Sequence, residues 1–250
     1  TGYLGDTLAK VAYEKASIIK EGVPVVCSPQ PPEVMRTISW MAECRASPIK
    51  FLGRDFYSEC LERSMEGVVV RLHSLDAEAR LGLLGRYQCQ NAAVAAQALL
   101  EVKGQVGVTR DDILEGLAQT RWPGRLDVVR RSPLTVLDVT HTPDGAKVVA
   151  SDLDLFQGRP RVMVVGMLKD KDAKGTMAHL APLFDHVVCT GPSTPRALSP
   201  DQMKEAATPF NINCTVVEGI ERAIRTAEAL AGKEGFVFIC GSLYTIGEAL

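Results

Sequence analysis

The second half of the chain alternates short apolar runs with amphipathic segments. The apolar runs are rich in β-branched residues, have the length of single strands and cover residues 134–137, 162–165, 187–189, 215–217 and 236–240. The intervening segments repeat apolar residues three or four positions apart, as helices packed on one face do, over residues 143–155, 173–183, 200–207 and 219–231. This alternation predicts an α/β fold with a parallel sheet covered by crossover helices.

The first half has a less regular pattern. Asp6 and Thr7 are predicted to cap a helix that runs to about residue 19, and Gly22 precedes a short, buried strand over residues 23–26. The other expected elements are a helix over residues 31–44, a strand over 67–72 and helices over 88–101 and 111–118. Pro123 and Gly124 interrupt the pattern, so a domain boundary is expected between residues 122 and 126.

Composition and charge narrow the class of protein. The 250 residues are 46% hydrophobic and 23% charged, as in ordinary globular proteins, and 28 Lys and Arg against 30 Asp and Glu give a net charge of −2. This balance predicts neither a nucleic-acid partner nor an acidic membrane surface. The longest apolar stretches are strand-sized, so no membrane span is expected. Seven widely spaced cysteines without a C-x-x-C pair favour reduced thiols in a cytoplasmic protein.

Candidate chemistry lies at the ends of the predicted strands, where parallel sheets bind ligands. Asp138 and His141 follow the first strand and precede a helix, a place suited to a ribose hydroxyl, a substrate ammonium or a phosphate oxygen. The residues alone favour the alternative, in which Asp138 caps a loop and His141 is solvated. Arg125 is a candidate phosphate clamp or a surface residue, and Lys171 lies in a charged loop that could simply be solvated.

Phosphate-binding motifs are absent from the sequence. No G-x-x-x-x-G-K-[ST] occurs in the 250 residues, and no G-x-G-x-x-G follows the first strand of the second half. The chain begins with Thr1 rather than Met and has no signal-peptide pattern. We therefore expect an N-terminal part to be missing.

Seven motifs, in this order, resemble the folylpolyglutamate synthase/dihydrofolate synthase family of Mur-type ligases, and together they cover almost the whole chain. They are Leu4-Gly5-Asp6-Thr7-Leu8 with Ala12-Tyr13-Glu14-Lys15-Ala16, Gly85-Arg86-Tyr87-Gln88-Cys89-Gln90-Asn91-Ala92-Ala93, Trp122-Pro123-Gly124-Arg125, Leu137-Asp138 with His141 and Pro143, Gly166-Met167-Leu168-Lys169-Asp170-Lys171-Asp172, Arg196-Ala197, and Gly241-Ser242-Leu243-Tyr244.

The resemblance implies a domain organisation. Residues 1–124 would form the end of a P-loop-type central ATPase domain, and residues 125–250 a C-terminal Rossmann-like domain. The P-loop half of the same protein, and a metal-binding histidine just upstream of Leu4, would precede residue 1.

The implied reaction is ATP-dependent amide formation. A folate or pteroate carboxylate is phosphorylated with Mg²⁺ present, and the amino group of L-glutamate attacks the acyl phosphate, releasing ADP and phosphate. Arg125 and His141 would act as cationic clamps on the phosphoryl oxygens. Asp138 would hold the ribose or orient its loop, and Asn91 would contact adenine.

The resemblance assigns three further residues. Lys15 matches a lysine that family members carry as a carbamate, which turns a cation into a carboxylate-like metal ligand. Lys171 and Ser242 match positions that face the incoming amino acid.

Two departures from the family pattern bear on the substrate. Asp138-Val139-Thr140-His141-Thr142-Pro143 stands where D-G-A-H-N-P is usual, and Tyr87 stands where the family has histidine. The bulkier side chains are expected to alter the glutamate site. The alternatives are therefore a Mur-type amide ligase for a different acid or amine, and a non-catalytic binding domain without a P-loop.

Overall fold

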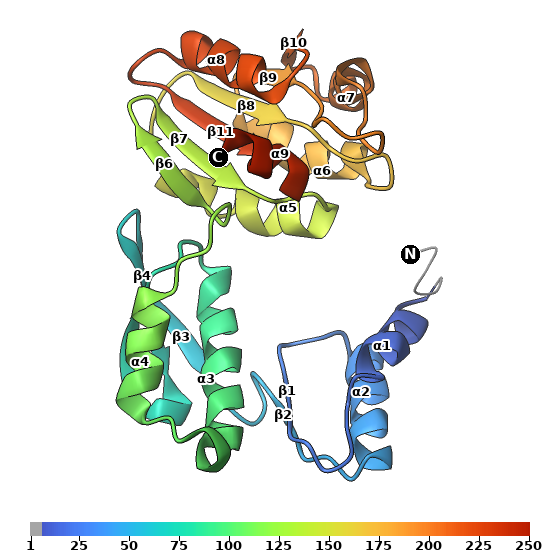
Figure 1. The fold of residues 1–250 in the computed structure, drawn as a ribbon, viewed down its shortest axis with the longest axis vertical. Coiled ribbons are helices and arrows are strands. Elements are labelled where there is room, and N and C mark those ends of the chain that lie inside the picture. Colours follow the sequence, from blue (N-terminus) through green and yellow to red (C-terminus); the bar gives the residue numbers. More distant parts are fainter. Residues whose placement is uncertain (1–6) are drawn as a thin grey trace. The chain divides into compact units, whose positions relative to one another are not determined.

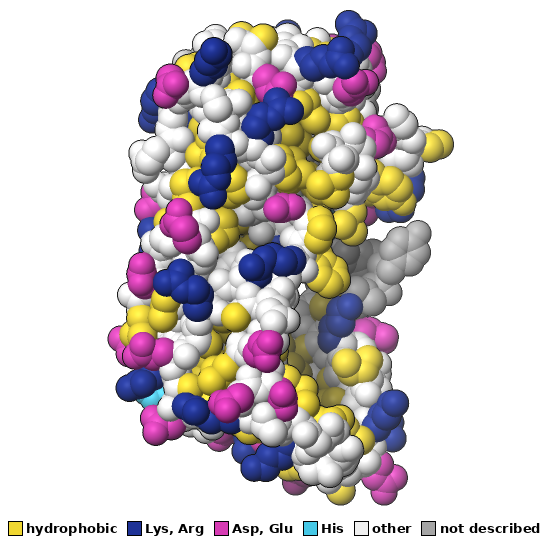
Figure 2. Space-filling view, turned by 60° about the vertical axis from the view of Figure 1, so that its left-hand side comes forward, with side chains coloured by type: hydrophobic (Ala, Val, Ile, Leu, Met, Phe, Trp, Pro, Cys, Tyr) yellow, Lys and Arg dark blue, Asp and Glu magenta, His cyan; other side chains and the backbone are white. Residues whose placement is uncertain are grey.

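The computed structural model describes residues 7–250, which form two compact units. The first comprises the chain up to residue 63 with residues 67–82 and 86–120, and the second comprises residues 121–250 with 64–66 and 83–85. The first unit has two sheets and the second has one, and each has its own buried core (Figure 1). Positive and negative side chains are interspersed over the face drawn in Figure 2. Leu4, Gly5 and Asp6, which belong to the first motif and the predicted helix cap, lie outside the described residues.

The first unit contains two small sheets. Its elements are α1 (Leu8–Ala16), β1 (Val25–Cys27), α2 (Pro32–Cys44), β2 (Ile49–Phe51), β3 (Ser58–Ser64), β4 (Gly67–Leu72), a 3₁₀ turn η1 (His73–Leu75), β5 (Ala77–Leu81), α3 (Tyr87–Val106) and α4 (Arg110–Gln119). β1 and β2 pair in parallel, and β3, β4 and β5 form a sheet in which β4 and β5 are antiparallel. The Thr7 hydroxyl caps α1 by accepting a hydrogen bond from the Lys10 N–H, so the predicted Thr7 cap is confirmed.

The core of this unit lies between α3 and the three-stranded sheet. Val68, Val70 and Leu72 of β4 are buried, and α3 presents the small side chains of Ala92 and Ala96 to the same cluster. Small residues let the helix approach the sheet closely. α3 is 20 residues long, and Gly107 ends it with a backbone in the left-handed region at φ 70°.

Several features of this unit differ from the expectation. The strand predicted as buried over residues 23–26 is β1, and all three of its residues are only half-buried. Within the described part of the chain its one strand partner is β2, which leaves its other edge open. β3 was not predicted because its residues, Ser58–Ser64, are mostly polar and form no apolar run, and none of them is buried.

The second unit is a six-stranded sheet covered by helices. Its elements are β6 (Asp127–Arg131), β7 (Leu134–Asp138), α5 (Pro143–Ala150), η2 (Leu153–Leu155), β8 (Arg161–Val165), α6 (Ala173–Leu180), η3 (Ala181–Leu183), β9 (His186–Cys189), α7 (Pro200–Ala207), η4 (Thr208–Phe210), β10 (Asn213–Val216), α8 (Ile220–Ala231), β11 (Phe236–Cys240) and α9 (Leu243–Ala249).

The strand order is β10-β9-β8-β11-β7-β6. The five strands predicted from the apolar runs are parallel, which confirms the α/β fold with a mainly parallel sheet. β6 was not predicted, and it pairs antiparallel with β7 at the edge. β11, the last strand in the chain, lies between β7 and β8 with all five residues buried.

Helices pack on both faces of this sheet. Val237 and Ile239 of β11 share a buried cluster with Ala223 and Ala227 of α8 and Ile246 of α9. α5, α6 and α7 pack side by side as a separate group (Figure 1). α5 ends at Ala150, before the predicted residue 155, and η2 begins after two intervening residues. Among residues 7–250 no helix is long and apolar enough to cross a membrane.

Candidate functional site

Four parallel strands end at one edge of the second unit's sheet. Cys240 of β11 is in register with Asp138 of β7 and with Val165 of β8, and Val165 is in register with Cys189 of β9. The loops that follow these strands therefore emerge together, as they do at ligand-binding edges of parallel sheets. Asp138, His141, Lys171 and Ser242, four of the residues singled out in the sequence, belong to this edge.

Asp138 turns its carboxylate inward. The side chain is 1% exposed, and Oδ2 accepts a hydrogen bond from the Leu126 N–H at 2.9 Å. Oδ1 accepts bonds from the Thr140 N–H at 2.9 Å and from the Thr140 hydroxyl. Burial raises the pKa of Asp138, and the donors on Thr140 and Leu126 oppose that shift because they favour the ionised form. These bonds favour the loop-orienting role over direct contact with ribose.

The loop that Asp138 holds carries Arg125. Gly124 has φ 74°, and its carbonyl accepts a hydrogen bond from the Val139 N–H at 2.9 Å. Leu126 is fully buried at φ 45°, a backbone conformation that costs energy for a residue with a side chain. Arg125 lies between these two anchored residues and is itself exposed. The fold therefore fixes its backbone and leaves the guanidinium open to solvent.

His141 lies three residues beyond Asp138 and is half-buried. Its Nδ1 is 2.8 Å from the carbonyl oxygen of Val139. A carbonyl only accepts, so Nδ1 carries the hydrogen, and Nε2 is the nitrogen left for a ligand. Arg125 and His141 both lie beside Val139. The Gly124 carbonyl, next to Arg125, accepts from the Val139 N–H, and His141 contacts the Val139 carbonyl through its ring, so both residues lie at the same strand end.

The residues that depart from the family's loop pattern pack into the unit or bond to its backbone. Val139 is 3% exposed and belongs to the buried cluster beside Ile246, and Thr140 is 5% exposed and bonded to Asp138. Thr142 caps α5 by accepting a hydrogen bond from the Gly145 N–H at 3.2 Å. The expectation that Val139 and Thr140 add bulk to an open substrate site is therefore wrong, because both side chains point into the unit.

Lys171 belongs to a small charged network. Its Nζ is 2.9 Å from Oδ2 of Asp170, and Arg196 Nη2 is 3.2 Å from the other oxygen of the same carboxylate. The hydrogen bond from Lys171 is the main reason that the pKa of Asp170 is lowered. Asp170 therefore links two cations from the loops that follow β8 and β9. The sequence placed Arg196 in a motif but gave no role to Asp170.

Ser242 begins the last helix. Its hydroxyl accepts a hydrogen bond from the Thr245 N–H at 3.0 Å, and the side chain is 3% exposed. The Thr245 hydroxyl donates to the Gly166 carbonyl at 2.7 Å, which ties α9 to the end of β8. Sequence periodicity missed this helix, and Ser242 as a substrate contact stays a prediction.

The two predicted residues of the first unit are both exposed. Asn91 lies in the first half of α3 and donates from Nδ2 to Oε1 of Gln88 at 2.9 Å. Lys15 lies on α1 close to its end. A carbamate forms on a neutral amine, which calls for burial or nearby positive charge. The surroundings of Lys15 within residues 7–250 do not supply that burial.

A metal site is not assembled by the described residues. No group of three or more His, Cys, Asp and Glu side chains in residues 7–250 is arranged to hold an ion. The candidate site of this chain is the strand edge that carries His141 and the Lys171 network, together with the adjoining loop that carries Arg125.

Comparison with known proteins identifies both the domain and the family. The family model for the Mur ligase, glutamate ligase domain matches residues 124–243. The chain is 29% identical over 251 residues to the dihydrofolate synthase/folylpolyglutamate synthase of Bacillus subtilis, and the match covers 98% of this chain and 58% of that protein.

Solved structures agree over the whole chain. A Mycobacterium tuberculosis folylpolyglutamate synthase complexed with ADP and AMPPCP superposes with a TM-score of 0.88 at 31% identity, over 100% of this chain and 60% of that one. A Yersinia pestis folylpolyglutamate synthase/dihydrofolate synthase complexed with AMPPNP and Mn gives 0.81 at 27% identity, over 100% and 57%. The chain spans about three-fifths of the length of these relatives. It belongs to the folylpolyglutamate synthase/dihydrofolate synthase family of Mur-type ligases.

Proposed function

We propose that this chain serves an ADP-forming ligase that adds L-glutamate to a folate or pteroate carboxylate. The acid attacks the terminal phosphorus of ATP and forms an acyl phosphate with release of ADP. The amine nitrogen then attacks the acyl carbon, phosphate leaves, and the nitrogen loses a proton. In this proposal residues 1–124 are the end of the central ATPase domain and residues 125–250 are the C-terminal domain.

The observation that carries the proposal is the anchored loop around Arg125. Its backbone is tied on both sides, to Val139 and to Asp138, while the guanidinium stays exposed. A cation held in this way loses little freedom when it meets a phosphoryl group, and that preorganisation is what stabilises charge developing in the transition state.

His141 and the charged loop complete the proposed roles. With Nδ1 committed to the Val139 carbonyl, His141 presents Nε2 and would donate to a phosphate oxygen as the imidazolium. Lys171 and Arg196, both held by Asp170, would face the carboxylates of the incoming amino acid. Ser242 would contribute through the start of α9, and Asn91 would contact adenine.

We assign no step to the metal ion. A divalent ion would offset phosphate charge, and the described residues do not form a site for it. Lys15 as a carbamate remains part of the proposal only for a larger assembly that covers this exposed side chain. A mass measurement on the whole protein with metal and bicarbonate should show the added carboxyl, and unmodified lysine under those conditions removes Lys15 from the site.

Calorimetry tests the dependence on a P-loop half. Because no Walker-type loop occurs in the 250 residues, we propose that the isolated chain binds ATP weakly and does not turn it over. Titration of ATP with Mg²⁺ should give no saturable heat at micromolar concentration. Micromolar affinity for this chain alone contradicts the proposal.

The amine is tested on the protein encoded by the whole gene. Phosphate release should be measured with pteroate or a folate as acceptor and with a panel of amino acids, and L-glutamate should give the highest rate. Activity with another amine and none with glutamate favours the alternative, a Mur-type ligase of different specificity. The absence of phosphate release with every pair favours a non-catalytic binding domain.

A further inference from the structure

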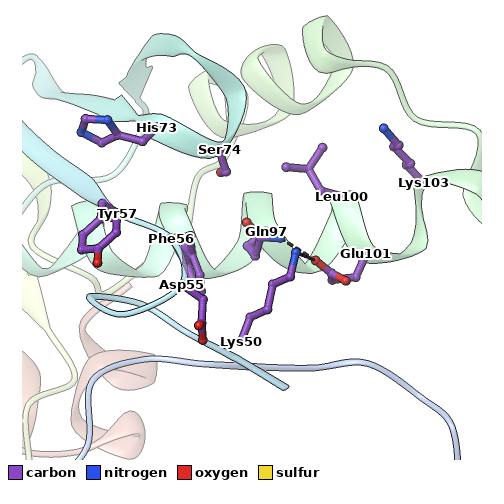
Figure 3. Close-up of a pocket in the computed structure, with 10 residues that line it drawn as sticks. All are labelled: Lys50, Asp55, Phe56, Tyr57, His73, Ser74, Gln97, Leu100, Glu101 and Lys103. Carbon is purple, nitrogen blue, oxygen red and sulfur yellow. Dashed lines mark hydrogen bonds and ion pairs between the residues drawn. The ribbon is translucent and has the colours of Figure 1, made fainter. Parts of the chain in front are cut away.

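A cavity of about 600 Å³ opens in the first unit beside the second half of α3 (Figure 3). Its volume lies in the range of pockets for small molecules, roughly 300–1,000 Å³. None of the residues assigned to the ligase reaction lines it. It is therefore a separate feature of this unit.

The deepest polar group of the cavity is the amide of Gln97, which is 4% exposed. Its Nε2 donates to Oε1 of Glu101 at 2.5 Å, and Lys50 Nζ lies 2.8 Å from the same oxygen. The hydrogen bond from Lys50 lowers the pKa of Glu101, so this carboxylate is ionised and only accepts. The Gln97 nitrogen must therefore face Glu101, as Figure 3 shows, and its carbonyl oxygen faces the other way.

That carbonyl oxygen is an acceptor without a donor among the described residues. An acceptor that lines a cavity and takes no donor from the described residues can accept a hydrogen bond from a ligand that brings an O–H or N–H group. Ser74, which also lines the cavity, has a hydroxyl that makes no hydrogen bond within residues 7–250. Both groups can therefore bind a polar ligand without breaking a contact that the fold uses.

The two ends of the cavity differ in chemistry. Tyr57 and His73 lie at one end and Lys103 at the other (Figure 3). A hydrogen bond of 3.2 Å from the His73 N–H to the Tyr57 carbonyl fixes the two ring-bearing residues beside each other. Aromatic side chains that are half exposed, as Tyr57 is at 52%, offer a face for stacking a planar ring.

The charges in and around the cavity favour an anion at the Lys103 end. Lys50 is balanced by Glu101, and the Asp55 carboxylate is balanced by Arg54 at 2.7 Å. Lys103 forms no ion pair within the described part of the chain and is exposed. One lysine of the lining is thus left with its charge uncompensated, at the opposite end of the cavity from Tyr57 and His73.

We propose that this cavity is a binding site for a nucleoside monophosphate. The base stacks at Tyr57 and His73, a ribose hydroxyl donates to the Gln97 carbonyl oxygen, and the phosphate binds Lys103. Pteroate also joins an aromatic ring to an anion, but its two ring systems need apolar walls. The apolar lining is limited to Phe56 and Leu100 besides the ring of Tyr57, so the nucleotide is the better fit.

The test is a calorimetric titration of the 250-residue chain with AMP. We expect saturable binding with a dissociation constant on the order of 0.1 mM. Lys103→Ala should weaken it about tenfold, because a charge-assisted contact to phosphate is lost. Lys20→Ala is the matched control, since Lys20 is an exposed lysine of the same unit outside the cavity, and it should bind AMP as the unsubstituted chain does.

Three further binding measurements test the proposed nucleotide site. Tyr57→Leu should weaken AMP binding while leaving the melting temperature near its original value, and adenosine should bind more weakly than AMP. Asn91→Ala should leave AMP binding unchanged, because Asn91 belongs to the proposed catalytic site and not to this cavity. That arm separates a failure here from a failure of the ligase proposal.

Several outcomes overturn the proposal. They are the absence of saturation up to about 10 mM AMP, equal affinity of the Lys103→Ala variant, and loss of AMP binding in Asn91→Ala. Binding of pteroate without binding of AMP also overturns it and reassigns the cavity to an acceptor site.

Discussion

The Leu126 N–H donates to Oδ2 of Asp138 at 2.9 Å, and the two residues lie twelve positions apart in the chain. This bond fastens the loop that enters the second unit to the end of β7. Because Arg125 precedes Leu126, the bond also sets where its exposed guanidinium emerges. A buried carboxylate thereby serves the proposed site through the backbone of another residue.

Asp138→Asn should destabilise the second unit by about 2–4 kcal/mol. Asparagine places an NH₂ group where a carboxylate oxygen accepts a backbone hydrogen bond, and an NH₂ group cannot accept that bond. Urea unfolding of the chain measures this. Asp127→Asn is the control, since its half-buried side chain accepts a bond from the Gly124 N–H at 3.2 Å, and it should cost less than about 1 kcal/mol. Equal costs for the two variants would show that burial adds nothing at Asp138.

Arg125→Ala should lower the rate of ligation by about a hundredfold or more in the protein encoded by the whole gene. The substitution removes a preorganised cation that would stabilise the phosphoryl group. Stability should change by less than about 0.5 kcal/mol, as expected for an exposed side chain. Phosphate release and a melting curve measure the two effects, with Arg131→Ala, also exposed, as control. Unchanged turnover removes Arg125 from the site.

Gly124→Ala should destabilise the second unit by about 2–4 kcal/mol. A Cβ there would lie 2.8 Å from Cγ2 of Ile246 and 3.2 Å from Cγ1 of Val139, on a backbone at φ 74°. Gly107→Ala, in the first unit, has a similar φ of 70° with ψ 17° in the left-handed helical region and open space around it, so it should cost about 1 kcal/mol from backbone strain alone. Thermal unfolding of both variants separates crowding from strain, and equal melting temperatures would contradict the crowding.

Arg161→Lys should lower the free energy of unfolding by about 3 kcal/mol, because lysine leaves buried carbonyl oxygens without a hydrogen-bond donor. The Arg161 guanidinium donates to the carbonyls of Leu183, Phe156 and Leu153 at 2.9, 2.7 and 3.1 Å. Its carbon also lies 4.5 Å from the centre of the Phe236 ring. Arg159→Lys, at a side chain 72% exposed, should cost less than about 1 kcal/mol in the same denaturation experiment. A small effect at both positions would contradict the role given to Arg161.

Glu101→Gln should make the free energy of unfolding depend less on pH in the acidic range. The hydrogen bond from Lys50 lowers the pKa of Glu101 below its ordinary 4.5, so the pair's contribution is complete above that pH. The contribution is lost as the pH falls through the depressed value, and it is about 0.5–1 kcal/mol. Urea midpoints between pH 7 and pH 3 measure it. Glu115→Gln, on α4, is the control and should keep the original slope.

The sequence by itself determined most elements of the second unit and the place of the candidate site. Five apolar runs of strand length with amphipathic segments between them sufficed for the α/β fold, and the rule that ligands meet strand ends led to Asp138 and His141. These features depend on periodicity and on order along the chain. Both are visible without knowing what any element packs against.

Other features depended on tertiary structure. β11 lies between β7 and β8, although it is the last strand in the chain, and the polar β3 and the edge strand β6 exist through their pairing. Asp138 could have faced a ligand or a loop, and the long-range bond to Leu126 decided for the loop. Val139 and Thr140 were expected to narrow an open site, and packing turned them inward. Strand neighbours, register and the partner of a buried carboxylate are set by contacts between distant residues, which periodicity does not encode.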